Sequence, residues 1–424
     1  MNMTMKSIPF SPPDMTEAEA KEVREAILSG WITTGPRTKK LERRISEYVC
    51  TEKTVCLNSA TAAMEMVLHL LQLGPEDEVI VPAYTYTASA SVTQHIGCKL
   101  VMVDSQRDNV EMDYDKLAEA ITERTKVIVP VDLGGVVADY DRVYEIVEAR
   151  KGMFRPSNAL QAKIGRIIVS ADCAHSFGGV RKEKMAGEIA DFSSFSFHAV
   201  KNFTTAEGGA MTWNLPFGNE IVPTDVDYML NVPKKEGETW NELLYRLSQL
   251  FSLHGQNKDA LAKTKLGAWE YDIIGPWYKC NMTDIMAALG LIQFDRYPQI
   301  LQRRYDIVDR YNDALKDLPV AVLNHKDENH CSSHHLYMVR LLGRTREETN
   351  KVIEQMAECG IATNVHYKPL PMMTAYKALG FDIVNYPNAY GLFENEITLP
   401  LHTKLTDEDV EYIITNFVDI IKNL

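Results

Sequence analysis

The sequence predicts an α/β protein, in which a large domain built on a mostly parallel sheet flanked by helices precedes a smaller C-terminal α+β domain. Short apolar segments alternate with amphipathic helical patterns between residues 58 and 197, which is typical of a parallel sheet covered by helices on both faces. From residue 282 the rhythm changes to one long helical pattern followed by mixed segments. The length of 424 residues also suits one large and one smaller domain.

Alternating helices and strands are predicted for the large domain, which we place at residues 1–281. The helical pattern from Asn58 to Gly74 keeps its apolar residues on one face, and Gly74-Pro75 ends it. The same patterns predict strands at Glu78–Pro82, Lys99–Asp104, Val127–Val131, Ile167–Ala171 and Asp191–Phe197, and helices at Ala88–His95, Tyr114–Glu123 and Asp141–Arg150.

Two irregular stretches interrupt this domain. We interpret residues 151–163, with Gly152 and Pro156, as an inserted loop, and residues 214–242, rich in Pro, Gly and charge, as a second insertion. The C-terminal region, residues 282–424, is predicted to hold a long helix from Met282, strands at Leu336–Leu342 and Ile361–His366, and helices at Arg346–Glu358 and Asp407–Ile421.

The charge and composition exclude some classes of function. A net charge of -13 argues against nucleic-acid binding, because no basic field would attract phosphates. A single phosphate can still bind to the backbone amides at a helix start. No apolar run has the length of a membrane span, and Met1–Phe10 lacks the features of a signal peptide. We therefore expect a cytoplasmic protein that does not contact a membrane.

Cysteine and histidine do not predict a metal site. The seven cysteines are scattered and contain no CxxC pair, so we expect reduced thiols. The run His330-Cys331-Ser332-Ser333-His334-His335 leads directly into a predicted strand. Adjacent histidines on a strand point to opposite faces and rarely share one ion. We therefore predict no metal.

Lys201 is the strongest candidate for a catalytic residue. It follows the alternating aromatic segment Phe195-Ser196-Phe197, and Glu207-Gly208-Gly209 comes shortly after. A lysine at the mouth of a sheet can capture a carbonyl as a Schiff base, and burial favours its neutral, nucleophilic form. Taken alone, the residue is better described as a loop lysine after an edge strand, and only its neighbours reverse that interpretation.

The helix start at Asn58-Ser59-Ala60-Thr61-Ala62 is a candidate phosphate site. Small residues leave the first amides and a hydroxyl free, and the helix dipole favours an anion there. A plain helix cap explains the same residues. Ser196, five residues before Lys201, is placed to give a further hydroxyl to a phosphate.

Asp172 and His175 follow the predicted strand that ends at Ala171, at the edge where open α/β sheets collect their ligands. An aspartate there can hold a pyridine nitrogen protonated, and the histidine can reach a phenolic oxygen on the ring. A capping aspartate beside a satisfied histidine remains the alternative. Tyr86, after another strand end, offers a face on which a ring can stack, although it can equally be core. Together with Lys201, these residues describe a site for pyridoxal 5′-phosphate.

On these motifs the sequence resembles the nucleotide-sugar aminotransferases of the DegT/StrS family, which have the aspartate aminotransferase (fold type I) architecture. The resemblance spans nearly the whole chain. Its motifs are Trp31-Ile32-Thr33-Thr34-Gly35-Pro36, Ser59-Ala60-Thr61-Ala62, Pro82 to Tyr86, Asp172 to His175, Ser196 to Asn202, Glu207-Gly208-Gly209, Met282-Thr283-Asp284 and Leu399-Pro400-Leu401.

The resemblance implies a role for each matching residue. Lys201 would bind the cofactor as a Schiff base and then shuttle protons. The cofactor would further contact Asp172 at the pyridine nitrogen, His175 at the phenolic oxygen, Tyr86 on the ring, and Ala60, Thr61 and Ser196 at the phosphate. The family's pattern also implies a homodimer with shared sites, in which Lys279 and Asn281 reach the neighbouring subunit's cofactor, and substrate contacts from Thr34, His366 and Tyr367.

Three features of the sequence depart from the family's usual pattern. Lys279-Cys280-Asn281 stands where many members have Asn-Tyr-Arg, and is closer to UDP-4-amino-4-deoxy-L-arabinose–oxoglutarate aminotransferase. Asp132-Leu133-Gly134-Gly135 replaces a run of the His-Leu-Tyr-Gly type, and both insertions are longer than usual. These departures bear on the identity of the substrate.

The resulting hypothesis is a ping-pong transamination in which glutamate, becoming 2-oxoglutarate, gives its amine to the keto group of a nucleotide sugar, for amino-sugar or cell-surface polysaccharide biosynthesis. A pyridoxamine-dependent deoxysugar dehydratase is the alternative within the family, although such relatives carry histidine in place of Lys201. An aldolase, a desulfurase and a non-catalytic regulator on the same fold are further alternatives. The presence of both Lys201 and Asp172 argues against the regulator.

Overall fold

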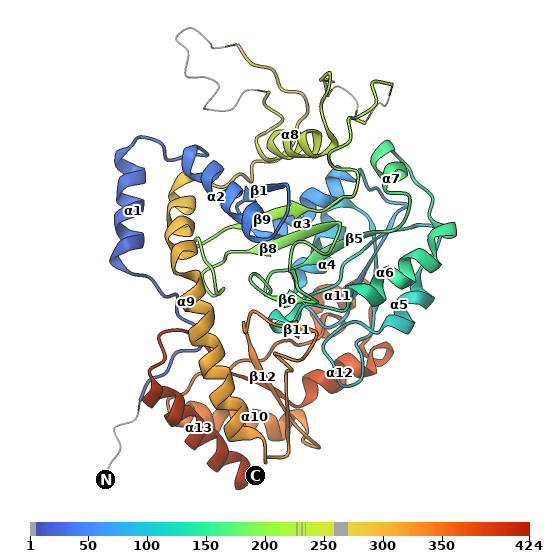
Figure 1. The fold of residues 1–424 in the computed structure, drawn as a ribbon. Coiled ribbons are helices and arrows are strands. Elements are labelled where there is room, and N and C mark those ends of the chain that lie inside the picture. Colours follow the sequence, from blue (N-terminus) through green and yellow to red (C-terminus); the bar gives the residue numbers. More distant parts are fainter. Residues whose placement is uncertain (1–5, 226–227, 230–231, 234, 258–269) are drawn as a thin grey trace.

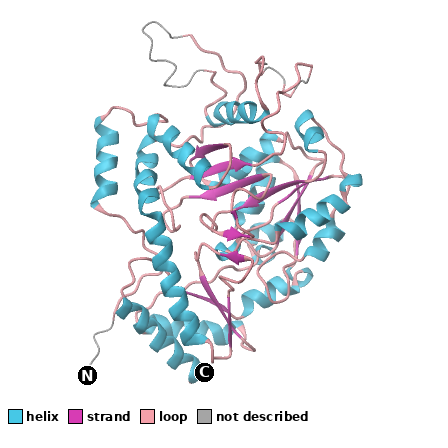
Figure 2. Ribbon diagram, in the orientation of Figure 1, coloured by secondary structure: helices cyan, strands magenta, loops and turns pink. Residues whose placement is uncertain are grey.

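A seven-stranded sheet lies in the middle of the molecule with helices on both of its faces (Figures 1 and 2). The computed structural model describes residues 6–225, 228–229, 232–233, 235–257 and 270–424. The strand order is β1-β9-β8-β5-β4-β2-β3. Only β9 runs antiparallel to its neighbours, β1 and β8, and the other pairs are parallel. The predicted mostly parallel sheet flanked by helices is therefore confirmed.

The strands of this sheet are short and almost entirely buried, as expected for a sheet covered on both faces. Their bounds are β1 (Lys53–Leu57), β2 (Glu78–Pro82), β3 (Lys99–Val103), β4 (Thr125–Ile128), β5 (Ile168–Asp172), β8 (Phe192–Ser196) and β9 (Gly209–Trp213). A small sheet pairs β11 (His330–Cys331) with β6 (Val180–Arg181), which in turn pairs with β7 (Lys184–Met185). The third sheet has the order β10 (Val320–Val322), β12 (Tyr337–Leu341) and β13 (Glu396–Leu399).

Helices surround these sheets, and most of the longer ones begin at a side-chain cap, because a cap satisfies amides that the first turn leaves free. The helices that precede the long connecting helix are α1 (Glu17–Leu28), α2 (Pro36–Tyr48), α3 (Ala60–Leu70), α4 (Thr87–Ile96), α5 (Tyr114–Ala120), α6 (Tyr140–Ala149), α7 (Ala159–Ile164) and α8 (Trp240–Ser252). The later helices are α9 (Asp284–Leu315), α10 (Arg346–Glu358), α11 (Thr374–Ala378), α12 (Pro387–Glu394) and α13 (Asp407–Lys422).

The long helix α9 connects the two ends of the molecule (Figure 1). It packs against α1 and α2 near its start and against α13 further along. A second hydrophobic core forms between the later part of α9, the third sheet (β10-β12-β13), and the helices α10 and α13, and it also includes Ile8. The boundary that we place between residues 281 and 282 stays a prediction.

The predicted elements of the large domain are confirmed with small shifts at their ends. β2 has the predicted bounds, and β3, β4, β5 and β8 differ from the predicted strands by one to three residues at an end. The helical predictions correspond to α3, α4, α5 and α6, and the C-terminal ones to α9, α10 and α13. In contrast, α1, α2, β1 and β9 lie outside the predicted elements.

The predicted strand at Ile361–His366 is wrong. Only Ile361 and Asn364 form isolated bridges, with Ile8 and Thr398. The segment does not continue as a strand, since the His366 amide donates to the buried Glu396 carboxylate at 2.9 Å instead of to a strand carbonyl. Residues 364–367 thereby turn inward and line a cavity.

The predicted inserted loop at residues 151–163 is also partly wrong. It ends in the short helix α7, which Asn158 caps by accepting from the Gln161 amide at 3.0 Å. Within the second predicted insertion, residues 226–227, 230–231 and 234 lie outside the described residues, and α8 begins at Trp240 before the predicted end of that stretch.

Within the part of the chain that the structure describes, no helix combines the length and apolar character needed to cross a membrane. Among the same described residues, no group of three or more His, Cys, Asp or Glu side chains is arranged to hold a metal ion.

Candidate functional site

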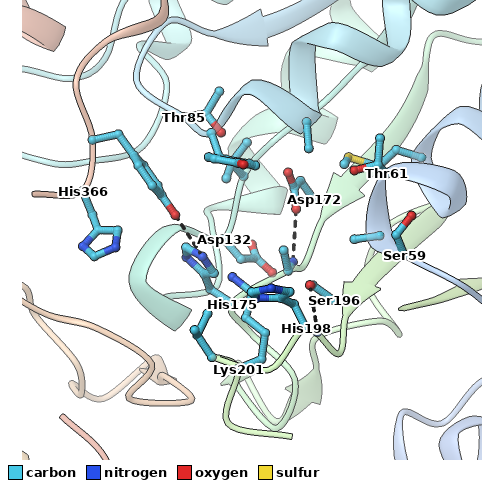
Figure 3. A pocket seen from close by; sticks show the side chains of 18 of the residues that line it. Ser59, Thr61, Thr85, Asp132, Asp172, His175, Ser196, His198, Lys201 and His366 are labelled. Atoms are coloured by element: carbon cyan, nitrogen blue, oxygen red, sulfur yellow. Dashed lines mark hydrogen bonds between the residues drawn. The ribbon is translucent and has the colours of Figure 1, made fainter. Parts of the chain in front are cut away.

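A cavity of about 600 Å³ opens at the carboxyl edge of the central sheet (Figure 3). The strands β2, β4, β5 and β8 run parallel, so the loops that follow them meet at this one edge. Nine of the predicted site residues line the cavity: Ala60, Thr61, Tyr86, Asp172, His175, Ser196, Lys201, His366 and Tyr367. The remaining three, Thr34, Lys279 and Asn281, do not.

Lys201 lies in the turn after β8, half-buried, with its side chain among the groups that line the cavity (Figure 3). Burial of the amine lowers the pKa of Lys201 to about 8, and the negative charge of Asp172 only partly offsets this effect. A sizeable fraction of the amine is therefore neutral near pH 8, as a nucleophile or a base must be.

Asp172 is the last residue of β5 and is buried at the base of the cavity. Ser89 Oγ donates to its Oδ2 at 2.6 Å, and the Ala174 amide donates to its Oδ1 at 3.1 Å. Burial raises the pKa of Asp172, while these two hydrogen bonds and the charge of Lys201 act in the opposite direction. The carboxylate is held in one orientation and faces the cavity.

The start of α3 forms one wall of the cavity. Ser59 caps the helix by accepting from the Ala62 amide at 3.1 Å, and the first two helical residues, Ala60 and Thr61, line the cavity. Gly209 of β9 lies directly against this turn, since a Cβ on it would come within 2.3 Å of the Ser59 carbonyl carbon. The glycine thus lets a strand pack against a helix start whose dipole favours an anion.

His175 has a defined set of hydrogen bonds. The Gly134 amide donates to His175 Nδ1 at 3.2 Å, and Nε2 lies 3.2 Å from the Tyr367 hydroxyl (Figure 3). Because Nδ1 accepts, the ring proton is on Nε2 and points to Tyr367. Burial lowers the pKa of His175 well below its ordinary value, and the nearby Lys201 contributes, so the ring is neutral.

Two aromatic rings and a buried histidine line the side of the cavity away from α3. The Tyr86 ring remains 59% exposed and lies 5.9 Å from that of Tyr367. His366 stacks on Phe10 with ring centroids 5.6 Å apart, and its Nδ1 lies 2.8 Å from Thr398 Oγ1. Burial lowers the pKa of His366 to about 3.

Thr34, Lys279 and Asn281 form a separate cluster. Asn281 Nδ2 donates to Thr34 Oγ1 at 2.5 Å, and Lys279 donates to the Asn281 side chain. The Thr34 hydroxyl donates in turn to the Met282 carbonyl at 2.6 Å. Lys279 is exposed. Within one chain these residues do not reach the cavity, so their predicted roles stay predictions.

Three further residues support the site and lie outside the predicted set. Ser89, the third residue of α4, orients Asp172. Asp132 is fully buried and accepts from Ser176 Oγ at 2.6 Å and Tyr140 Oη at 2.9 Å, which holds the loop after β4. Burial raises the pKa of Asp132 to about 6. Asn202, beside Lys201, bonds to residues far away in the sequence.

These groups fit pyridoxal 5′-phosphate. The cavity brings together a partly neutral lysine, an oriented carboxylate and a helix start with free amides, and Gly209 leaves room where a Cβ would collide. When bound, this cofactor supplies a ring that accepts the electron pair released at a substrate carbon.

Comparison with known proteins agrees with this fit. The sequence profile of the DegT/DnrJ/EryC1/StrS aminotransferase family matches residues 13–418. The pyridoxamine phosphate form of Spr1654 from Streptococcus pneumoniae, described as a sugar aminotransferase, is 57% identical with a TM-score of 0.90, covering 98% of this chain and 100% of that one. The same protein has also been solved in its pyridoxal phosphate form, at 55% identity.

Two further relatives extend the comparison. Helicobacter pylori PseC, an aminotransferase involved in the biosynthesis of pseudoaminic acid, is 25% identical with a TM-score of 0.82, covering 99% of this chain and 100% of that one. The spore coat polysaccharide biosynthesis protein SpsC of Bacillus subtilis is 32% identical over 423 residues, 98% of this chain and 97% of the relative. The predicted fold type I architecture, aminotransferase activity and pyridoxal phosphate cofactor are thereby confirmed, and the chain belongs to the DegT/DnrJ/EryC1/StrS aminotransferase family.

Proposed function

We propose that this aminotransferase moves the amino group of glutamate onto the keto group of a nucleotide-linked sugar, in amino-sugar or cell-surface polysaccharide biosynthesis. The observation that carries the proposal is the meeting of Lys201, Asp172 and the start of α3 in one cavity. The names of SpsC and PseC support the amino-sugar and polysaccharide context.

Each cavity residue would have a distinct task. Lys201 holds the cofactor and then carries a proton to and from the substrate carbon, which its pKa of about 8 allows near neutral pH. Asp172 would hold the pyridine nitrogen protonated, and Ala60, Thr61 and Ser196, which line the same cavity, would hold the phosphate. His175 and Tyr367 form a hydrogen-bonded pair on the opposite side, toward the phenolic oxygen and the substrate.

The substrate side would be completed by a second copy of the chain. Thr34, Asn281 and the exposed Lys279 are joined by hydrogen bonds outside the cavity. In a homodimer with shared sites, Lys279 would add a positive charge near the neighbouring subunit's cofactor, in a cavity whose only lysine is Lys201 among the described lining residues. A nucleotide sugar as the substrate and a cytoplasmic location are proposed with this assembly.

The test begins with the visible absorbance of the purified protein. We expect a band from lysine-bound pyridoxal phosphate that Lys201→Ala abolishes and that glutamate converts to the pyridoxamine form. Lys351→Ala, which changes an exposed lysine on α10, should leave the band unchanged. A protein without this band, and without a response to glutamate, would refute the proposal.

The acceptor is identified in a second step. A panel of keto-sugar nucleotides is assayed with glutamate, and NMR reads the ring position of the new amine. Conversion of a deoxysugar with loss of water and no amine transfer would instead favour the dehydratase. The presence of Lys201 in place of the histidine of those relatives favours transamination. Single-turnover conversion with glutamate also separates an enzyme from a non-catalytic regulator.

A further inference from the structure

The turn that carries Lys201 is bound to a segment from the distant C-terminal region. Asn202 is buried, and its Nδ2 donates to the Ser333 carbonyl at 2.7 Å. Its Oδ1 lies 2.9 Å from His335 Nδ1. Because Asn202 Nδ2 faces a carbonyl, its Oδ1 faces the histidine. His335 Nδ1 therefore carries a hydrogen and donates a hydrogen bond to Asn202 Oδ1. Both ends of the Asn202 amide are therefore engaged beside Lys201.

The same segment supports His175. The ring centroids of His335 and His175 are 4.4 Å apart. The His335 amide donates to the Gly134 carbonyl at 3.1 Å, and the Gly134 amide donates to His175 Nδ1. Gly135 has a φ of +96°, and a Cβ there would lie 2.3 Å from Ser333 Oγ. The Gly134-Gly135 turn, where the chain departs from the family's usual motif, thus makes room for this segment.

Buried Arg304 of α9 fixes the segment from behind. Its Nε donates to the His334 carbonyl at 2.8 Å and its Nη2 to the His335 carbonyl at 2.7 Å. Just before the segment, β11 pairs with β6. Residues 332–335 are thus tied to α9, to the large domain and to the Lys201 turn at once, so His335 has a defined position from which to hold Asn202.

We propose that the hydrogen bond from His335 to Asn202 is a positioning contact that keeps the Lys201 turn packed against the cavity, beside His175. The inference rests on the proposed role of Lys201. Releasing Asn202 would let the turn move and bring water to the amine, which favours its charged form. His335 also interacts electrostatically with Lys201, but burial lowers the pKa of His335 well below its ordinary value, so its substitution removes no charge. The other titratable groups that interact with Lys201 are Asp172, His175 and His366, and none of these three changes in the variants below.

Two substitutions of His335 separate the hydrogen bond from simple packing. His335→Phe keeps a ring against His175 and removes the donor. His335→Asn removes the ring and keeps an amide N–H near the place of Nδ1. Asn202→Ala removes the acceptor and leaves the His335 ring in place. Positioning by the hydrogen bond predicts that His335→Phe and Asn202→Ala behave alike, while His335→Asn resembles the unchanged protein.

The measurement is the pH profile of Lys201 methylation by formaldehyde and borane in the full-length, cofactor-free protein, read by mass spectrometry. The midpoint should be about 8 in the unchanged protein and in His335→Asn. In His335→Phe and Asn202→Ala it should rise to about 9 or above, which lowers the neutral fraction at pH 8 about fivefold. A midpoint unchanged in both of these variants, or raised in His335→Asn alone, overturns the inference.

Two controls keep the outcomes distinct. Circular dichroism checks the fold of each variant before labelling, and if His335→Phe does not fold, Asn202→Ala carries the test. Separately, borohydride reduction of the unchanged protein with pyridoxal phosphate shows whether Lys201 binds the cofactor. Failure to trap the cofactor on Lys201 refutes the proposed function, whereas the methylation midpoints alone decide the role of His335.

Discussion

Replacing Asp284 by asparagine should destabilise the protein more than most single changes, because this buried carboxylate organises the start of α2. Its Oδ1 accepts from the Gly35 amide at 2.8 Å and from the Thr38 amide and hydroxyl at 2.9 and 2.7 Å. Its Oδ2 accepts from the Arg37 amide at 3.0 Å. Asp284 therefore joins the first turn of α9 to the N-terminal motif that contains Thr34.

The magnitude follows from these four bonds. The amide NH₂ of asparagine has to face an N–H, and leaving the Arg37 amide without its acceptor costs about 1–3 kcal/mol. The other three bonds lose their charge, at about 0.5–1 kcal/mol each, and the start of α2 loses a favourable anion worth about 0.5 kcal/mol. The total is about 3–6.5 kcal/mol.

Differential scanning calorimetry gives the test. For a chain of 424 residues the unfolding entropy near the midpoint is about 0.9 kcal/mol/K. Asp284→Asn should therefore lower Tm by about 3–7 °C. Asp115→Asn, at an exposed position in the first turn of α5, is the matched control and should stay within about 1 °C. A Tm for Asp284→Asn that matches this control would refute the reasoning.

Three further predictions concern the site and its frame. Gly209→Ala should weaken pyridoxal phosphate binding at least tenfold in a fluorescence titration, because its Cβ would lie 2.3 Å from the Ser59 carbonyl carbon. The control Gly391→Ala, where the added Cβ meets open space, should not weaken binding, and equal affinities of the two variants would contradict this prediction. Ser89→Ala should slow the glutamate half-reaction about tenfold, because it removes a charge-assisted hydrogen bond to Asp172. Ser91→Ala, on the same helix, should leave the rate unchanged. A normal rate for Ser89→Ala would count against a role for Ser89 in orienting Asp172. Glu19 has its pKa lowered from 4.5 to about 2 by hydrogen bonds from Thr16 and Arg296 that outweigh its burial, so its stabilisation is complete above pH 4.5 and is lost as the pH falls toward 2. The Tm deficit of Glu19→Gln should thus shrink between pH 7 and pH 3, and a constant deficit would show that the charge is not responsible.

Local patterns were sufficient for most of the central sheet. The runs that became β2 and β5 each contain three consecutive apolar β-branched residues, Val79-Ile80-Val81 and Ile167-Ile168-Val169, beside polar or turn residues, and a short buried parallel strand has this form. The predicted strand at Ile361–His366 also alternates β-branched residues, yet its His366 amide donates to the Glu396 carboxylate, 30 residues later, instead of to a strand partner. The sequence of the six residues themselves gives no indication of this distant contact.

The site shows the same division between local and distant information. Lys201, Asp172, Tyr86 and Ser196 were predictable because each lies at or shortly after the carboxyl end of a parallel strand, and such ends share one edge of the sheet. Ser89 was not, because a serine in a helix is usually exposed and only the packing of α4 brings it 2.6 Å from Asp172.

The sequence by itself thus determined the fold class, the cofactor and most of the predicted residues that line the cavity, since strand and helix periodicities and chain order decide which side chains reach the sheet edge. Only the tertiary structure decided how those residues are held. The partners of Asn202 lie more than 130 residues away along the chain, and the orientation of a buried amide or imidazole depends on which distant group packs beside it.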